Sequence, residues 1–384
     1  MFLEVRFSTF TFGAQRLSVW TWHSGTARTA GPVKIVGSGL IGTSIGLALT
    51  QAGVTVLISD SSPAIQDLAV DFGAGQSFQQ GQNPSLVIVC VPPDVTATVI
   101  EQQLSLHPEA TVTDVASVKA TILAKLEASS ADLSRYVGSH PMAGREQAGA
   151  LAGRSDIFTG RPWVISPNKL SAKTSIDLVE ALALDLGATL VQLNPNDHDR
   201  AVALVSHAPQ LVASLLAARL SDSESKDIAL AGQGLRDTTR IAASDPKLWI
   251  QILAANSQEV AKVIESLKFD LDQVLESLQQ VGKPGSLASI GKLLEAGNLG
   301  VSRIPGKHGQ SATQYAKVVV MIDDKPGELA RLLTEIGEVG INLEDLTLEH
   351  ATGAAVGLPE LYVLPSAEKQ LVSELTSRGW KIVG

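Results

Sequence analysis

Three polar stretches of this chain carry side chains that could act on a small substrate. The residues of greatest interest are His140 in the run GSHPMAG at 138–144, Ser117 in the run DVASVK at 114–119, and Arg240 in the run RDTTRI at 236–241. An imidazole changes its charge near neutral pH, so His140 could take a proton from a substrate hydroxyl. We expect it to lie in a loop whose glycines let the backbone approach a ligand. The alternative is a histidine that only bonds carbonyl groups of its own loop.

The other candidates each have a functional and a structural interpretation. Ser117 could orient the imidazole, but serine is also a common N-cap of helices. Arg240 lies in an apolar helical stretch. An unpaired guanidinium there would cost much free energy, so it needs a carboxylate from a substrate or from Asp237. His198 and His207 fall on later expected helices, where a buried histidine is more often a core residue than a ligand.

A glycine-rich turn near the start of the chain predicts dinucleotide binding. Gly37, Gly39 and Gly42 form a G-x-G-x-x-G pattern between an expected strand and an expected helix, and Asp60 follows Gly42 by 18 residues at the end of the next strand. That order and spacing are typical of dinucleotide-binding folds. Gly37 permits the tight turn, Gly39 lets the backbone approach a pyrophosphate, and Gly42 lets helix and strand pack closely.

The same region predicts which dinucleotide is bound. The backbone N–H groups of Leu40 and Ile41 begin the helix and would face the pyrophosphate. Asp60 would accept hydrogen bonds from the ribose hydroxyls and would repel a 2′-phosphate. No Lys or Arg follows in the run Ser61-Ser62-Pro63-Ala64 to neutralise such a phosphate. We therefore expect NAD as the cofactor.

Composition limits the class of protein. The chain has 384 residues, enough for two or three domains, and a formal net charge of −9 without a basic stripe, so no nucleic-acid partner is expected. Cys90 is the only cysteine. A single cysteine excludes intrachain disulfides and cysteine-cluster zinc sites, and it suits a reducing compartment. We therefore expect a cytoplasmic protein without a metal. No apolar run reaches about 18 residues, so no membrane span is expected.

The pattern of apolar residues changes along the chain and predicts separate domains. Residues 33–195 alternate strand and helix, which is typical of a Rossmann-like α/β doubly wound sheet. Residues 196–300 carry almost only helical signals, with helices apolar on more than one side, so we expect an all-α domain that also packs against a second copy of the chain. Residues 301–314 resemble a linker. Residues 1–32 hold several arginines and one acid; they could be a transit peptide, but we expect a disordered extension.

Some elements of the first domain can be placed in detail. We expect a buried strand at 86–91, a helix at 95–106 with Asp94 as its N-cap, and a strand at 111–114. A short strand is expected at 136–138, before the histidine loop. The carboxyl ends of such strands are where a parallel sheet binds its ligands.

The last part of the chain, 315–384, has a different order of elements. Its strands and helices are expected in the order β-α-β-β-α-β, which is the ferredoxin-like unit. Gly327 falls at the start of the first helix, where free backbone N–H groups could meet the carboxylate of a small ligand. One uncovered sheet face and strand edge favour pairing with a second copy.

At these residues the chain resembles the prephenate/arogenate dehydrogenase family of tyrosine biosynthesis, with a C-terminal ACT domain. The resemblance covers about residues 33–384. It rests on the GSHPMAG run and on the RDTTRIA run followed by Trp249, which are far more specific than a general dehydrogenase pattern. It implies NAD-dependent oxidative decarboxylation of prephenate to 4-hydroxyphenylpyruvate.

The resemblance also implies roles for individual residues. His140 would be the catalytic base, Ser117 its hydrogen-bond partner, and Arg240 the anchor of the substrate carboxylate, while His207 and Trp249 would line the substrate pocket. The stretch around Asp324, Pro326 and Gly327 is similar to the ACT loop that binds a regulatory amino acid. Tyrosine, the end product of the pathway, is the expected effector; the alternatives are another amino acid, or a module that binds none and only helps the chain to dimerise. A homodimer is the expected assembly.

Three alternatives stay open. The substrate could be arogenate, which differs from prephenate in its side chain. A β-hydroxyacid dehydrogenase would share the architecture, but it relies on a lysine in the helical domain for which no matching motif is found. An inactive amino-acid sensor could keep the Rossmann domain as a scaffold, but it would not need Ser117, His140 and Arg240.

Overall fold

The computed structural model divides the chain into two compact units, residues 1–267 and 268–384. The residues that it describes are 9–12, 15–18, 27–144, 149–305, 315–350 and 356–383. The first unit therefore contains both the expected α/β region and the first helices of the helical region.

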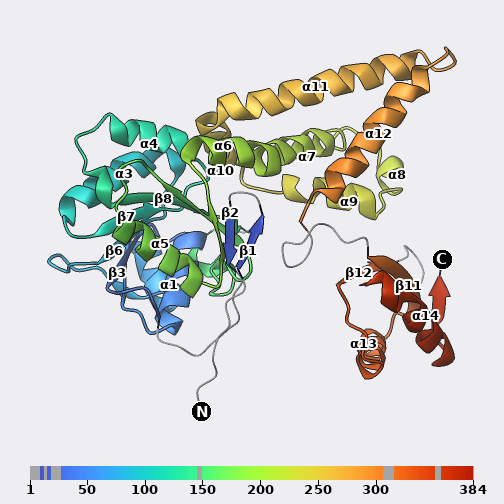
Figure 1. The fold of residues 1–384 in the computed structure, drawn as a ribbon, viewed down its shortest axis with the longest axis horizontal. Helices are drawn as coiled ribbons and strands as arrows, with labels where there is room; N and C mark the ends of the chain where they lie inside the picture. Colours follow the sequence, from blue (N-terminus) through green and yellow to red (C-terminus); the bar gives the residue numbers. More distant parts are fainter. Residues whose placement is uncertain are drawn as a thin grey trace. The chain divides into compact units, whose positions relative to one another are not determined.

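An eight-stranded sheet forms the centre of the first unit (Figure 1). Its strands in chain order are β3 (Val33–Val36), β4 (Val56–Ser59), β5 (Gln76–Ser77), β6 (Leu86–Val89), β7 (Thr111–Asp114), β8 (Tyr136–Pro141), β9 (Pro162–Pro167) and β10 (Thr189–Gln192). Their spatial order is β10-β9-β8-β7-β6-β3-β4-β5. In this spatial order, the neighbouring strands β8, β7, β6, β3, β4 and β5 are parallel, as expected of a Rossmann-like sheet.

The expected repetition of strand–helix units fails after β8. Strand β9 runs antiparallel to β8, and β10 runs parallel to β9. A parallel pair requires a long crossover, usually a helix. In the described part of the link between β8 and β9, the regular structure is only a short 3-10 turn, Ala150–Ala152.

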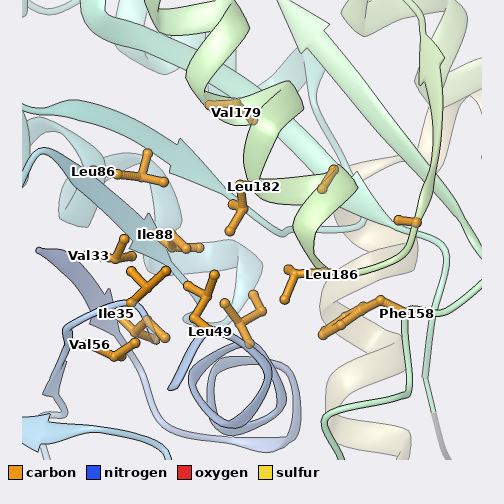
Figure 2. Packing of buried hydrophobic residues seen from close by; sticks show 14 of the residues in the cluster. Val33, Ile35, Leu49, Val56, Leu86, Ile88, Phe158, Val179, Leu182 and Leu186 are labelled. Carbon is orange, nitrogen blue, oxygen red and sulfur yellow. The ribbon is translucent and has the colours of Figure 1, made fainter. Parts of the chain in front are cut away.

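Helices cover both faces of this sheet because its strands are apolar on both sides. The helices are α1 (Leu40–Gln51), α2 (Pro63–Asp71), α3 (Pro93–Leu106), α4 (Ala120–Glu127) and α5 (Lys173–Asp185). Ile35 and Ile88 belong to the core that includes residues of α1 and α5, shown in Figure 2. The next residue of β6, Val89, belongs to the opposite core with α3 and α4. This alternation follows from the two-residue period of a strand.

Two local expectations for this unit are corrected. Asp94 is not the N-cap of α3: that position is Pro92, and Asp94 lies in the first turn. The prolines at 92 and 93 place the helix start earlier, because the fixed φ of proline suits the first helical position. Near the N-terminus, β1 (Thr9–Phe12) and β2 (Gln15–Ser18) pair as an antiparallel hairpin, where we expected no regular structure. Alternating β-branched and aromatic residues at 9–12 favour a strand.

The region after β10 is helical, as expected. Its α-helices are α6 (Pro195–Val202), α7 (Ala208–Ala218), α8 (Ser225–Ile228), α9 (Gln233–Thr239), α10 (Pro246–Ala255), α11 (Ser257–Gln279) and α12 (Ser286–Ser302). A π-helical turn, Ala203–His207, joins α6 to α7. Helix α12 extends into the expected linker, and residues 306–314 of that linker lie outside the described part of the chain.

The helix formed by α6, the π turn and α7 corrects the expectation about apolar runs. This helix, Pro195–Ala218, has 24 residues and is long and apolar enough to cross a membrane by length and composition. However, His198, Asp199 and His207 are buried on it against the rest of the protein. These polar side chains hold one side of the helix on the first unit, whereas Leu204, Val205 and Leu215 of the same helix are exposed.

Residues 315–350 and 356–383 contain a four-stranded antiparallel sheet with two helices, in the expected β-α-β-β-α-β order. The elements are β11 (Ala316–Asp323), α13 (Glu328–Glu338), β12 (Asp345–His350), β13 (Val356–Val363), α14 (Glu368–Ser377) and β14 (Lys381–Val383). The strand order is β12-β13-β11-β14. Val318, Val320 and Ile322 alternate along β11 into a core with residues of both helices.

Candidate active site

The glycine turn after β3 has a separate steric reason for each of its glycines. Gly37 has φ of +97°, and a Cβ atom there would lie 2.4 Å from the carbonyl oxygen of Cys90. A Cβ atom on Gly42 would lie 2.0 Å from the carbonyl oxygen of Gly37. A Cβ atom on Gly39 would meet no atom within 4 Å. Two glycines are therefore needed for packing, and the third leaves an open face for a ligand.

The start of α1 and the side chain of Asp60 lie beside this turn. Gly39 is the N-cap of α1 and provides no side-chain cap, so the first N–H groups of the helix, which include those of Leu40 and Ile41, are left for a ligand. Asp60 Oδ2 accepts hydrogen bonds from the backbone N–H of Ser38 at 2.7 Å and from its hydroxyl at 2.9 Å. These residues fit a dinucleotide: an open glycine, an anion-binding helix end and a fixed acid.

His140 lies in a strand and not in a loop, which corrects our expectation. Strand β8 continues through His140 to Pro141 because it pairs with β9, with His140 opposite Val164. His140 is 8% exposed. Ser139 Oγ donates to the backbone oxygen of Asp114 at 2.7 Å, which ties β8 to the end of β7. The imidazole is therefore held on a rigid element at the carboxyl edge of the parallel sheet.

A chain of hydrogen bonds joins His140 to a carboxylate on α6. Nδ1 of His140 lies 2.9 Å from Nε2 of His198, and the two rings meet edge to face. Nδ1 of His198 lies 2.7 Å from Oδ1 of Asp199. In the described part of the chain, Nε2 of His140 has no hydrogen-bond partner. The free nitrogen of His140 is therefore the one that could meet a substrate.

Asp199 also holds α6 against the sheet. Its carboxylate accepts the backbone N–H of Lys119 at 2.8 Å and that of Ala120 at 2.9 Å, at the N-terminus of α4. A carboxylate at this helix end is stabilised by the unpaired N–H groups and by the helix dipole. Asn194 starts α6 by accepting the N–H of Asp197, with Pro195 at the first helical position.

Burial keeps both linked histidines neutral. The pKa of His140 lies well below its ordinary value, mainly because burial disfavours the charged ring, with further contributions from His198, Lys119 and His207. The pKa of His198 is also lowered by burial, although the hydrogen bond with Asp199 opposes the shift. A neutral imidazole can accept a proton, which is what a general base requires.

A buried ion pair lies at the end of β7, close to this chain. Lys119 bonds Asp114, and both side chains are almost fully inaccessible. Asp114 also accepts the hydroxyl of Tyr136 at 2.8 Å and the N–H of Ala116 at 2.9 Å. These donors satisfy the carboxylate, and the lysine contributes to the lowered pKa of His140.

A second histidine of the long helix lies at the end of the π turn. Nδ1 of His207 lies 3.1 Å from the side-chain nitrogen of Asn256, which also donates to the backbone oxygen of Asp199 at 2.8 Å. Nε2 of His207 is buried and has no hydrogen-bond partner in the described part of the chain. The ring of Trp249 contacts that of His207 edge to face, with centroids 6.1 Å apart. The predicted neighbours His207 and Trp249 are thus brought together.

Two predicted site residues have surroundings that differ from our expectations. Ser117 is half-buried and, within the described ranges, is not hydrogen-bonded to His140; nor is it the N-cap of α4, which is Lys119. Arg240 is exposed in a 3-10 turn, Arg240–Ala242, so our argument from the cost of a buried charge was wrong. The carboxylate of Asp237 accepts a hydrogen bond from Gln233 at 2.7 Å.

Sequence reasoning missed the residues that position His140 and His207. His198 was interpreted as an ordinary core histidine, and Asp199 and Asn256 were not noticed. The available signal was the adjacent pair His198-Asp199 near the start of a helix that becomes mostly apolar after Arg200. Buried charged residues are rare unless paired, so this pair indicates a specific contact.

The fold and these residues define a dinucleotide-dependent dehydrogenase, with a Rossmann-like sheet followed by a helical region. Residues 45–192 match the nucleotide-binding domain of prephenate dehydrogenase, and residues 194–290 match its dimerization domain. NovF of Streptomyces niveus, described as a probable prephenate dehydrogenase, is 36% identical over 353 residues, which cover 90% of this chain and 98% of NovF. The chain belongs to the prephenate dehydrogenase family.

Solved structures agree with this assignment. The structure of prephenate dehydrogenase from A. aeolicus, in complex with hydroxyphenyl propionate and NAD+, aligns with a TM-score of 0.62 and 28% identity, covering 70% of this chain and 97% of that one. The structure of Synechocystis arogenate dehydrogenase aligns with a TM-score of 0.59 and 25% identity, covering 70% of this chain and 98% of that one.

Proposed function

We propose that this chain catalyses the NAD-dependent oxidative decarboxylation of prephenate to 4-hydroxyphenylpyruvate. The observation that carries the proposal is the neutral imidazole of His140, fixed on β8 with Nε2 free of partners in the described part of the chain. It lies at the same sheet edge as the glycine turn, because β3 and β8 belong to the same parallel set. Family membership supplies the substrate class.

The protein residues would act on the substrate in the following way. His140 takes the proton of the ring hydroxyl through Nε2, and the carbon that bears the hydroxyl gives up a hydride. The bond between the ring and its carboxylate breaks, its electron pair completes the aromatic ring, and carbon dioxide leaves. NAD⁺, when bound, accepts the hydride. The proton returns to the phenol oxygen.

Two side chains are proposed to hold the substrate. His207 would donate its unpaired Nε2–H to a substrate oxygen, and Trp249 would cover the ring of His207 on one side. Arg240 is proposed to bind a substrate carboxylate from its exposed position. Ser117 stays a predicted partner of the imidazole.

Arogenate is the alternative substrate. It has an alanyl side chain in place of the pyruvyl side chain of prephenate, and the similarity to Synechocystis arogenate dehydrogenase keeps it open. The test is turnover of each substrate by the purified full chain with NAD⁺, followed by NADH absorbance. His140→Asn keeps a hydrogen-bonding group but no proton acceptor, so kcat should fall by about 10²-fold or more. Turnover of neither substrate by the wild type would overturn the proposal.

We infer that residues 315–384 form an ACT-like regulatory domain. The antiparallel order β12-β13-β11-β14 with two helices is that of a ferredoxin-like unit. Asp324, Pro326 and Gly327 lie exposed in the turn before α13, and Gly327 is an N-cap without a side-chain cap. The free N–H groups there support binding of an amino-acid carboxylate, with tyrosine as the proposed effector.

We also propose that the chain acts as a homodimer in the cytoplasm. The match of residues 194–290 to a dimerization domain supports the assembly. Large apolar side chains are exposed on the helices of this region, among them Leu275 on α11 and Leu294 on α12. A second copy would cover such surfaces.

A further inference from the structure

We propose that Asp199 and His198 are positioning residues that fix the tautomer of His140, so that Nδ1 carries the proton and Nε2 is the bare nitrogen. The tautomer follows from the hydrogen bonds themselves. Only its consequence for turnover depends on the proposed function.

The first step concerns the charge of Asp199. Its carboxyl group is buried and faces the backbone N–H groups of Lys119 and Ala120, at 2.8 and 2.9 Å. Backbone N–H groups can only donate. An ionised carboxylate accepts from both of these groups and keeps a further lone pair on Oδ1. Oδ1 then accepts from Nδ1 of His198, at 2.7 Å.

The second step concerns the two rings. His198 is neutral and its proton is on Nδ1, so its Nε2 has a lone pair. The contact of 2.9 Å with Nδ1 of His140 then needs the proton of His140. Since the neutral ring of His140 has only one N–H, its Nε2 is bare and can accept the substrate proton.

The same chain would stabilise the charge that forms during turnover. When Nε2 of His140 takes a proton, the ring becomes an imidazolium whose Nδ1–H still donates to His198. The negative charge of Asp199 lies one imidazole farther away. Lys119 would oppose this cation, but its own ammonium bonds Asp114. An acid that orients a catalytic imidazole and stabilises its cation is a known arrangement in other enzymes.

Asp199→Asn tests the proposal because an amide cannot replace the carboxylate. Oδ1 of Asp199 accepts from Lys119 and faces Nδ1 of His198, whereas Oδ2 accepts from Ala120, so one amide oxygen cannot serve both positions. With the oxygen toward Ala120, the NH₂ group would face Nδ1 of His198. His198 would then carry its proton on Nε2, and His140 would be forced to carry its own on the catalytic nitrogen. We expect kcat to fall by about 10²-fold or more, with KM changed by less than about 3-fold. Asp197→Asn changes a partly exposed residue on the same helix; it is the matched control and should keep the wild-type kcat.

A second pair of variants guards against a simple loss of folding. In His198→Gln the side-chain oxygen can still accept Nδ1–H of His140, whereas His198→Leu offers no acceptor. We expect His198→Gln to retain about 10-fold more kcat than His198→Leu. Equal kcat in the two variants, or wild-type kcat in Asp199→Asn, would overturn the proposal.

Ring-nitrogen NMR of the full chain with isotope-labelled histidine reads the tautomer without any substrate. The His140 signal is identified by its loss in His140→Asn. The wild type should show a protonated Nδ1 and a bare Nε2, and Asp199→Asn should show the reverse. A protonated Nε2 in the neutral wild-type ring would overturn the proposal. If the wild type shows the expected tautomer but turns over neither substrate, the positioning role of Asp199 and His198 is supported and the proposed function fails.

Discussion

Nδ1 of His207 lies 3.1 Å from the side-chain nitrogen of Asn256, and this contact determines which nitrogen of His207 carries a proton. The NH₂ group of Asn256 has one hydrogen for Asp199 and one for His207, so Nδ1 of His207 is an acceptor. Its Nε2 is therefore an N–H donor, buried without a partner in the described ranges. Leaving a buried donor unsatisfied costs about 1–3 kcal/mol, so a ligand that accepts this hydrogen bond would gain affinity.

The donor of His207 should contribute to substrate binding. A hydrogen bond to a charged group contributes about 1.5–3 kcal/mol, so His207→Leu should raise KM for prephenate by about 10–150-fold. The kcat should change much less. His207→Gln, which keeps an N–H donor, is the control and should give a smaller rise. An unchanged KM in a folded His207→Leu variant would mean that this donor faces no substrate.

NAD⁺ should be preferred over NADP⁺. Asp60 is fixed beside the glycine turn by Ser38, where its carboxylate suits ribose hydroxyls and repels a 2′-phosphate. Asp60→Ser should narrow the ratio of kcat/KM values for the two cofactors. Asp67→Ser, an exposed acid on α2, should leave the ratio unchanged. A wild-type preference for NADP⁺ would contradict this prediction.

The folded protein should lose stability as the pH falls below about 6.5, the ordinary pKa of histidine. The pKa of His207 is lowered by burial to about 4, and those of His140 and His198 are lowered too. The unfolded chain therefore binds more protons than the folded protein in this range. The free energy of unfolding decreases further with each unit by which the pH falls. His207 alone should reduce the free energy of unfolding by about 2 kcal/mol at pH 5.

Urea unfolding at several pH values measures this loss. His207→Gln removes one titrating group and should flatten the dependence on pH. The same decrease in both proteins would show that His207 does not titrate as expected.

Arg240 should bind the substrate and have little part in the chemical step. Arg240→Gln removes a charged hydrogen bond to a carboxylate, so KM should rise by about 10-fold or more while kcat falls less. Arg236→Gln, a change at another exposed arginine in the same stretch, is the matched control. If both variants keep the wild-type KM, Arg240 has no role in carboxylate binding.

Tyrosine should inhibit the full chain through residues 315–384. A chain shortened to end near Gly309 should stay active and lose any inhibition. Asp324→Ala in the full chain should weaken inhibition, because Asp324 lies in the turn before α13. A full chain that ignores millimolar tyrosine, or a shortened chain inhibited equally, would rule out this route of regulation.

The sequence by itself determined the features that depend on short-range geometry. The turn of Gly37, Gly39 and Gly42 could be recognised because it lies between a strand and a helix in one short segment, where Gly37 has positive φ and Gly42 packs on the carbonyl oxygen of Gly37. The strand Thr111–Asp114 has the predicted bounds, since a short run of buried, β-favouring residues has a local signature. His140 could be selected as a candidate because its run of residues is so specific.

The tertiary structure alone decided what surrounds that histidine. Strand β8 extends through His140 only because β9 returns beside it. His198 lies 58 residues farther along the chain, and it reaches His140 because Asp199 caps α4 and sets the rotation of α6. Arg240 is exposed although the apolar run Ile241-Ala242-Ala243 follows it, because exposure depends on which helix faces are packed. Hydrogen bonds between residues distant in the chain depend on such packing, and no local pattern encodes it.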